Sequence, residues 1–127
     1  MNLKQIQKFQ RQFVKARDWE KFHHPKNLVM ALAGETGELV ELFQWLSEAE
    51  SYEIMSSRQR AEAVRHELAD IFYYLCRICD LLEVDLEKAF WEKLALNKKR
   101  YPVRLARGSR TKYTELTSQK PKKRRKS

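Results

Sequence analysis

Glycine and proline are scarce in this sequence, with three of each among 127 residues. Because tight turns between strands rely on these two residue types, a fold built from many β-strands is disfavoured. The sequence also lacks an apolar run close to the roughly 18 residues that a membrane span requires. Its N-terminus, MNLKQIQKFQRQF, is polar and periodic, unlike a signal peptide. We therefore expect an all-α protein of the cytoplasm that has no membrane partner.

Cysteine is sparse as well, and the two cysteines, Cys76 and Cys79, form a single C-x-x-C pair. A zinc site would need a second pair of ligands at a suitable spacing, and none accompanies this one. The pair also falls in the middle of a segment with helical periodicity. We expect two reduced thiols.

The excess of positive charge is confined to one end of the chain. The formal net charge is +9, and residues 103–127 alone contain ten Lys or Arg and one Glu. Residues 1–102 are therefore neutral overall. We expect residues 1–102 to form a helical domain and residues 103–127 to form a basic, partly disordered extension. The extension is either a solubilising tail or a segment for nuclear import or nucleic-acid contact.

Apolar residues recur at helical spacing over four segments, residues 3–17, 27–46, 56–82 and 86–100. Ser56 and Gln59 match a capping box at the start of the third segment, and Asp85 is a suitable N-cap for the fourth. Residues 18–26 are expected to be a loop, and residues 48–57 a turn. Four helices with short connections predict a four-helix bundle.

Two pairs of carboxylates lie on these segments, Glu35 with Glu38 and Glu67 with Asp70. At about 100° per residue, Glu35 and Glu67 each point into the apolar stripe of their helix. Glu38 and Asp70 lie about 60° to one side. Carboxylates that face a protein interior are unfavourable unless they are protonated or matched by cations. Both helices are thus expected to turn an acidic pair inward.

A bound metal ion would balance these acids. The ligands are all hard oxygens without His or Cys on the same stripe, which favours Mg²⁺ or Mn²⁺. Because Mg²⁺ in proteins commonly bridges substrate phosphates, the substrate is expected to be a phosphoanhydride or phosphodiester. The alternative is that both pairs are ordinary solvated faces that form ion pairs with Lys or Arg.

Other side chains near the acidic positions suit a nucleotide. Trp45 and Tyr74 lie close to them in helical projection and could sandwich a base, although each aromatic taken singly is more typical of a core. Lys93 and Asn97 share one stripe of the fourth helix, as phosphate and sugar contacts require. A solvated polar face is equally compatible with that stripe.

The two acidic pairs, together with RDWEKFHHPKNL, ELFQW and NKKRYPV around them, resemble the MazG-like all-α nucleoside triphosphate pyrophosphatase superfamily. The resemblance covers residues 3–116 and is greatest to the branch that acts on dCTP. It implies a homo-oligomeric helical bundle, a dimer or tetramer, that hydrolyses a nucleoside triphosphate to the monophosphate and pyrophosphate. Gln10 departs from the pattern, because dCTP-specific relatives often carry His there, and this leaves the base preference open.

The resemblance also implies roles for individual residues. It implies that four carboxylates bind the metal: Glu35, Glu38, Glu67 and Asp70. It implies that three aromatic residues form the base pocket, Trp19, Trp45 and Tyr74. On the fourth helix, it implies that Lys93 and Asn97 contact the substrate. We expect metal-assisted attack of water on the α-phosphorus, with Glu35 or Glu38 as the base. The alternative function is a helical nucleic-acid-binding or interaction module that uses the basic extension.

Overall fold

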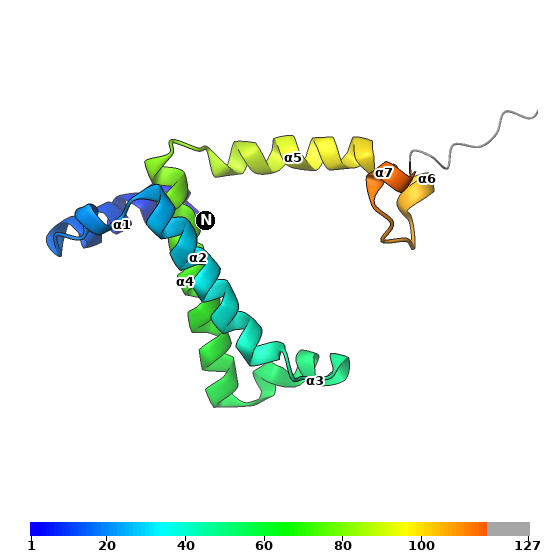
Figure 1. Ribbon diagram of the computed structural model, residues 1–127, viewed down its shortest axis with the longest axis horizontal. Helices are drawn as coiled ribbons and strands as arrows, with labels where there is room; N and C mark the ends of the chain where they lie inside the picture. Colours follow the sequence, from blue (N-terminus) through cyan, green and yellow to red (C-terminus); the bar gives the residue numbers. More distant parts are fainter. Residues whose placement is uncertain (117–127) are drawn as a thin grey trace, which may run out of the picture. The chain divides into compact units, whose positions relative to one another are not determined.

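The computed structural model describes residues 1–116, and all of its regular structure is helical, as predicted (Figure 1). The elements in chain order are α1 (Leu3–Ala16), η1 (Glu20–Phe22), α2 (Pro25–Phe43), α3 (Glu48–Glu53), η2 (Ile54–Ser56), α4 (Arg58–Leu81), α5 (Leu86–Arg100), α6 (Val103–Ala106) and α7 (Tyr113–Leu116). The chain divides into two compact units, and the boundary falls between Val84 and Asp85. Among the helices of residues 1–116, none combines the length and apolarity that crossing a membrane requires.

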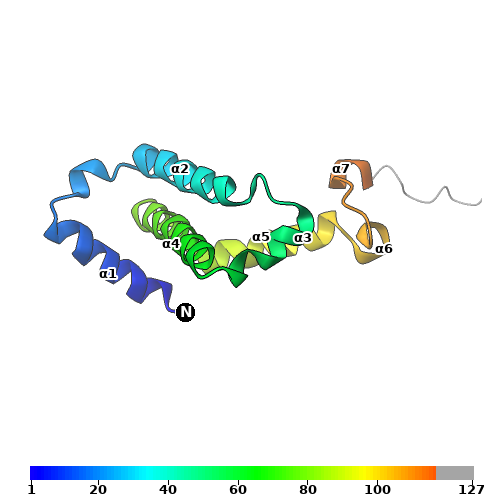
Figure 2. The same cartoon turned by 90° about the horizontal axis from the view of Figure 1, so that it is seen from below.

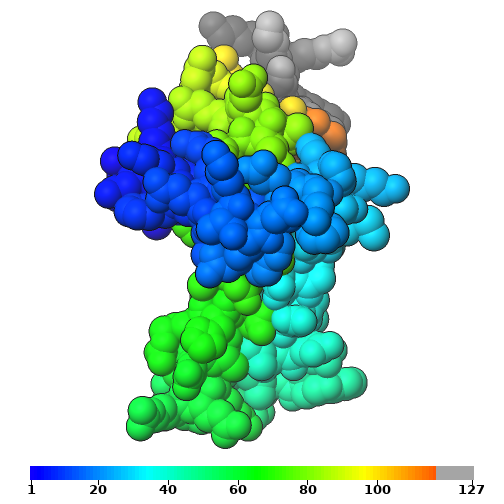
Figure 3. Space-filling view, turned by 90° about the vertical axis from the view of Figure 1, so that its left-hand side faces the viewer, coloured from blue at the N-terminus to red at the C-terminus, as the bar shows by residue number. Residues whose placement is uncertain are grey.

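The first unit is built on two long helices, α2 and α4, which run antiparallel and pack along each other (Figures 1 and 2). Helix α1 packs against α4 as well, and the blue segment of Figure 3 shows it together with the connection that leads to α2. The buried apolar side chains come from all three helices and from η2, namely Val14, Leu28, Ile54, Ala61, Val64, Cys76 and Cys79. Both cysteines are free, as expected.

Polar contacts to α4 hold α1 in place. The Nε2 atom of Gln7 donates to the backbone carbonyl of Cys76 at 3.3 Å, and that of Gln10 donates to the carbonyl of Tyr73 at 3.0 Å. The Arg11 guanidinium contacts the carboxylate of Asp80, which lies one turn beyond Cys76 on α4, at 2.6 Å. These three side chains are spaced so that they follow one face of α1. Their contacts determine which stretch of α4 lies beneath α1.

Helix boundaries follow local signals. Helix α2 begins at Pro25, two residues before the predicted start, because proline is well suited to the first turn of a helix. The N-cap of α4 is Ser57, one residue later than predicted, since the Ser57 hydroxyl, and not that of Ser56, accepts from the backbone N–H of Arg60.

The prediction of a turn over residues 48–57 is wrong. Helix α3 and η2 occupy nearly all of this segment. The reason is a capping box: the Ser47 side chain accepts from the backbone N–H of Glu50, and the Glu50 carboxylate accepts from that of Ser47. The S-x-x-E pattern at residues 47–50 is the sequence feature that indicates the start of this helix.

The second unit begins with α5, whose bounds match the prediction. Asp85 is its N-cap and accepts from the backbone N–H of Lys88 at 3.0 Å. The ring of Tyr113, which follows Pro102 in the chain, has its centroid 4.5 Å from the Arg100 guanidinium carbon. The expected boundary at residue 102 and the partly disordered extension stay predictions. The basic run at 120–127, on which the nucleic-acid alternative depends, lies outside the described residues.

Candidate metal and nucleotide site

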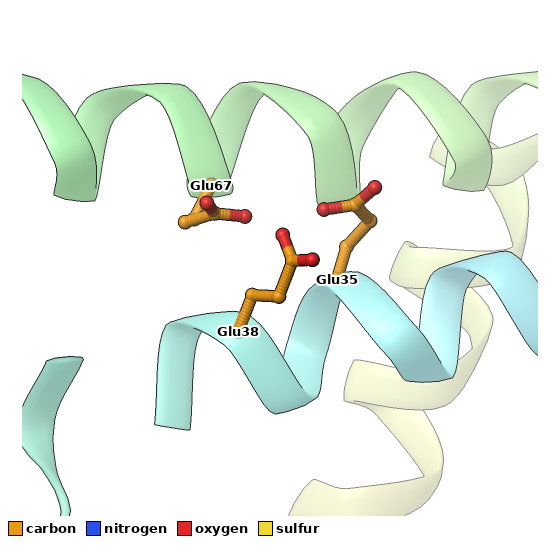
Figure 4. A group of neighbouring side chains, drawn as sticks. All are labelled: Glu35, Glu38 and Glu67. Atoms are coloured by element: carbon orange, nitrogen blue, oxygen red, sulfur yellow. The ribbon is translucent and has the colours of Figure 1, made fainter. Parts of the chain in front are cut away.

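Three of the four predicted carboxylates meet between the two long helices. Glu35 and Glu38 project from α2 toward Glu67 on α4 (Figure 4), and each contributes an oxygen that lies within 4.8 Å of the other two. Their spacing explains the meeting, since residues three apart on α2 share the face that packs on α4. We call these residues the carboxylate cluster.

The protein supplies few hydrogen-bond or charge partners to the carboxylate cluster. Glu35 and Glu67 are half-buried. The Oε2 atom of each is inaccessible to water, and it has no hydrogen-bond partner in the described part of the chain. The ion pairs found among residues 1–116 involve other acids, Asp18, Asp80 and Glu92. A buried, unpartnered carboxylate oxygen is unfavourable unless a cation or a proton reaches it. The cluster therefore has the donor chemistry of a site for a hard divalent cation.

The crowding raises the pKa of two of these acids. Partial removal from water, proton sharing with Glu38 and Glu67, and the negative charges of Glu38 and Asp70 raise the pKa of Glu35 to about 7. Removal from water, followed by the proximity of Glu38, also raises the pKa of Glu67. A bound cation would reverse this effect, because it favours the ionised form of each carboxylate.

Asp70, the fourth predicted ligand, is not part of the close group. It is exposed on α4 one turn beyond Glu67, and its charge acts on Glu35 and Tyr74. Asp70 thus borders the carboxylate cluster without touching it. Its role as a metal ligand stays a prediction.

The predicted aromatic residues are distributed unevenly around the cluster. Tyr74 borders it, since loss of water contact and then the charges of Glu35 and Asp70 raise the pKa of its phenol. Trp19 precedes α2, and Trp45 follows it with 87% of its surface exposed. A helix of 19 residues is about 28 Å long. One chain therefore does not bring Trp19 and Trp45 to the same base.

A row of four aromatic rings links Trp19 to the cluster. Ring centroids are 5.7 Å apart between Trp19 and Phe13, 6.5 Å between Phe13 and Tyr73, and 5.3 Å between Tyr73 and Tyr74, all edge to face. A cavity of about 590 Å³ lies between α1 and α4 and is lined by Phe9, Gln10, Phe13, Phe72 and Tyr73. We call it the aromatic cavity. Phe9, Phe13, Phe72 and Tyr73 are not among the site residues that the sequence predicts.

Lys93 and Asn97 lie one turn apart on α5, in the second unit. Lys93 is exposed and Asn97 is half-buried. The carbonyl of Asn97 accepts from the backbone N–H of Tyr101 at the end of the helix. Their contact with a substrate stays a prediction.

Comparisons with known proteins agree with the helical fold. The family described as MazG-like matches residues 31–116. The chain is 46% identical to dCTP pyrophosphatase 1 of Rattus norvegicus and of Homo sapiens over 115 residues, which are 90% of this chain and 67% of each relative. A solved pyrophosphatase from Archaeoglobus fulgidus superposes with a TM-score of 0.73 at 35% identity and covers 78% of this chain and 91% of its own.

Proposed function

The chain belongs to the MazG-like family, and from this membership we propose that it is a magnesium-dependent nucleoside triphosphate pyrophosphohydrolase. Its substrate is dCTP or a modified dCTP, and its products are the monophosphate and pyrophosphate. The observation that carries the proposal is the carboxylate cluster, where three oxygens from two helices lie within 4.8 Å of one another. The identity with dCTP pyrophosphatase 1 supports the choice of nucleotide.

Glu35, Glu38 and Glu67 hold the metal, and Asp70 completes the set from the edge of the cluster. The buried oxygens of Glu35 and Glu67 that lack a partner among the described residues support this assignment. When bound, Mg²⁺ neutralises phosphate charge and lowers the pKa of a coordinated water, and Mn²⁺ is the expected substitute.

Glu35 or Glu38 removes the proton from the attacking water. The water oxygen forms a bond to the α-phosphorus, and the bond from that phosphorus to the bridging oxygen breaks. Pyrophosphate leaves with the electron pair of the broken bond. Lys93 and Asn97 bind the phosphates and the sugar, in keeping with their position on one stripe of α5.

The aromatic cavity receives the base. Gln10 lines this cavity, and its Nε2 atom donates to the Tyr73 carbonyl. Its Oε1 atom is an acceptor without a partner in the described chain. An acceptor at this place suits a base with an exocyclic amine, such as cytosine. Trp45 stacks on the base from a second copy of the chain, because it lies at the far end of α2 from Trp19. The working enzyme is therefore a homo-oligomer, a helical bundle completed between copies.

A panel of canonical and modified NTPs and dNTPs with Mg²⁺ tests the function, with pyrophosphate release as the readout. We expect release to be fastest with dCTP or one of its modified forms. The matched control is Glu35→Gln, which keeps the shape of the side chain and removes its charge. Equal release by the control, or no release with any nucleotide, would reject the proposal.

A further inference from the structure

A second cavity of about 460 Å³ lies in the first unit, between α1, η1 and the C-terminal part of α4. None of its lining residues belongs to the carboxylate cluster. The charged and titratable residues of its wall are Lys8, Arg11, Lys15, Glu20, His23, Arg77 and Asp80. Four cations thus face two carboxylates. We call it the basic cavity.

Arg77 gives the basic cavity a buried charge. Its surface is 3% exposed, and its Nη1 atom contacts the Asp80 carboxylate at 3.2 Å. Asp80 is shared, since its other oxygen contacts Arg11 at 2.6 Å. One carboxylate therefore serves two guanidinium groups. The Nε atom of Arg77 is also buried, without a partner in the described part of the chain. A buried cation in this condition favours an anion nearby.

The cations of α1 add to this charge from one side. Lys8, Arg11 and Lys15 are spaced at i, i+3 and i+7 and so share one face of their helix. Neither Lys8 nor Lys15 takes part in an ion pair with another of the described residues. Both ammonium groups remain able to bind a ligand.

His23 contributes polarity without charge. Burial, followed by the charge of Arg77, lowers the pKa of its imidazole, so the ring is neutral at pH 7. Its Nδ1 atom is buried and has no hydrogen-bond partner among residues 1–116. The wall of the basic cavity thus combines fixed positive charge with a neutral polar ring.

The geometry points to a binding site for a small ligand that carries phosphate groups. Phosphate oxygens suit guanidinium and ammonium donors, and the net charge of the wall matches a ligand with two negative charges or more. A cavity of this size lies within the usual range for small-molecule sites, about 300 to 1,000 Å³. The phosphate belongs either to free pyrophosphate or to a nucleotide. This inference concerns a separate cavity and does not rest on the proposed function.

Isothermal titration of the full chain, stripped of metal over a chelating resin, tests the site with sodium pyrophosphate and with a nucleoside monophosphate. Removal of metal prevents either probe from binding through a cation at the carboxylate cluster. We expect one site per chain. Lys15→Gln weakens binding about tenfold, as the loss of one charged hydrogen bond implies. Glu20→Gln strengthens binding, because it removes a repulsive carboxylate from the wall.

Lys26→Gln is the matched control, since Lys26 is exposed on α2 and does not line the basic cavity. It removes the same charge and leaves the affinity unchanged. Tighter binding of the monophosphate than of pyrophosphate, with the same response to Lys15→Gln, supports the site and identifies a nucleotide as its ligand. No binding of either probe, or equal affinities in all three variants, would overturn the inference. Hydrolysis by Lys15→Gln with Mg²⁺ stays normal, which separates this site from the proposed active site.

Discussion

Glu35 and Glu67 each hold one carboxylate oxygen away from water, facing each other across two packed helices. Removal from water, followed by the proximity of Glu38, raises the pKa of both groups. A protein gains no stability from such an arrangement by itself. The arrangement is favourable only when a cation or a proton binds, which is why these side chains are better explained by chemistry than by folding.

Replacement of Glu35, Glu38, Glu67 or Asp70 with Ala should abolish most hydrolysis while the metal-free fold stays as stable as before or becomes more stable. Loss of one charge relieves repulsion in the metal-free protein and removes a ligand from the loaded one. We expect pyrophosphate release to fall by about 10² to 10⁴-fold. Magnesium should raise the melting temperature of the wild type more than that of any variant, because stabilisation grows with affinity for the native state.

Gln substitutions of the three glutamates and an Asn substitution of Asp70 serve as controls of shape. They should behave like the Ala variants if charge is what matters. Full activity in an Ala variant would count against the metal site. So would a lower melting temperature without metal, which is the behaviour of a broken structural ion pair.

The stability of the metal-free protein should fall as the pH rises from about 4.5 to about 7. The pKa of Glu35 is raised from 4.5 to about 7, so the folded protein holds a proton over this range that the unfolded chain releases. An acid whose pKa is raised in the folded state favours folding at low pH, and the loss is complete above the folded pKa. Melting temperatures of metal-stripped protein between pH 5 and 8 measure the effect. Glu35→Gln should flatten this part of the profile, and an unchanged slope would refute the assignment.

At the scale of helices, the length of α2 separates the two tryptophans assigned to the base pocket. Trp19 is connected to the carboxylate cluster by the ring contacts through Phe13 and Tyr73, whereas Trp45 makes no ring contact with a residue of the described chain. A tryptophan that is almost fully exposed adds little to the stability of its own chain. Its contribution is therefore expected at a ligand or at a second copy.

Trp45→Ala and Tyr74→Ala should raise KM for the nucleotide without reducing the stabilisation by Mg²⁺ alone. Loss of one stacked ring costs roughly 1 to 3 kcal/mol, which corresponds to an increase in KM of about five- to 150-fold. Steady-state kinetics and melting curves measure the two effects. Tyr52→Ala is the matched control, because Tyr52 is an exposed aromatic residue on α3 away from the cluster residues. If the Trp45 and Tyr74 variants unfold instead, these rings serve the core.

Gln10 links α1 to α4 at the aromatic cavity, and its replacement should alter the choice of base. Gln10→His exchanges a flexible amide for a rigid ring with a different arrangement of donor and acceptor. We expect the ratio of kcat/KM for dCTP to that for dTTP to increase. An unchanged ratio, with both values intact, would show that this position does not contact the base.

At the scale of the whole molecule, several large apolar side chains remain exposed in the isolated chain. Phe90 and Trp91 on α5 are 57% and 58% exposed, and Val29, Met30 and Val40 of α2 are exposed as well. Large apolar surfaces on two helices are typical of chains that pack against a partner. A second copy would cover them and would bring Trp45 to an active site.

We therefore expect the protein to be an oligomer of at least two chains at micromolar concentration. Light scattering coupled to gel filtration measures the mass directly. Trp91→Glu places a charge within the apolar surface of α5 and should shift the population toward single chains, whereas Lys88→Glu on the same helix should not. A wild-type mass equal to that of one chain would contradict the prediction.

Local sequence patterns are sufficient to predict the helical class and the bounds of α1 and α5 nearly to the residue. The sequence also predicts that both acidic pairs face inward, which is right for the half-buried Glu35 and Glu67 and wrong for Glu38 and Asp70, which are exposed. These features depend on local rules, because helical periodicity and N-capping residues act over a few positions. Even so, the S-x-x-E pattern at residues 47–50 starts α3 where a turn is predicted. Motifs along the chain likewise predict membership of the family.

Which side chains meet depends on how the helices pack. The register of α2 against α4 brings Glu35, Glu38 and Glu67 together and leaves Asp70 at the edge. Packing of α1 on α4 creates the aromatic cavity and the basic cavity, including the sharing of Asp80 between Arg11 and Arg77. Register depends on how side chains far apart in sequence interlock, and periodicity along one helix does not encode it. Each helix face was therefore predictable, whereas the partner of each face was not.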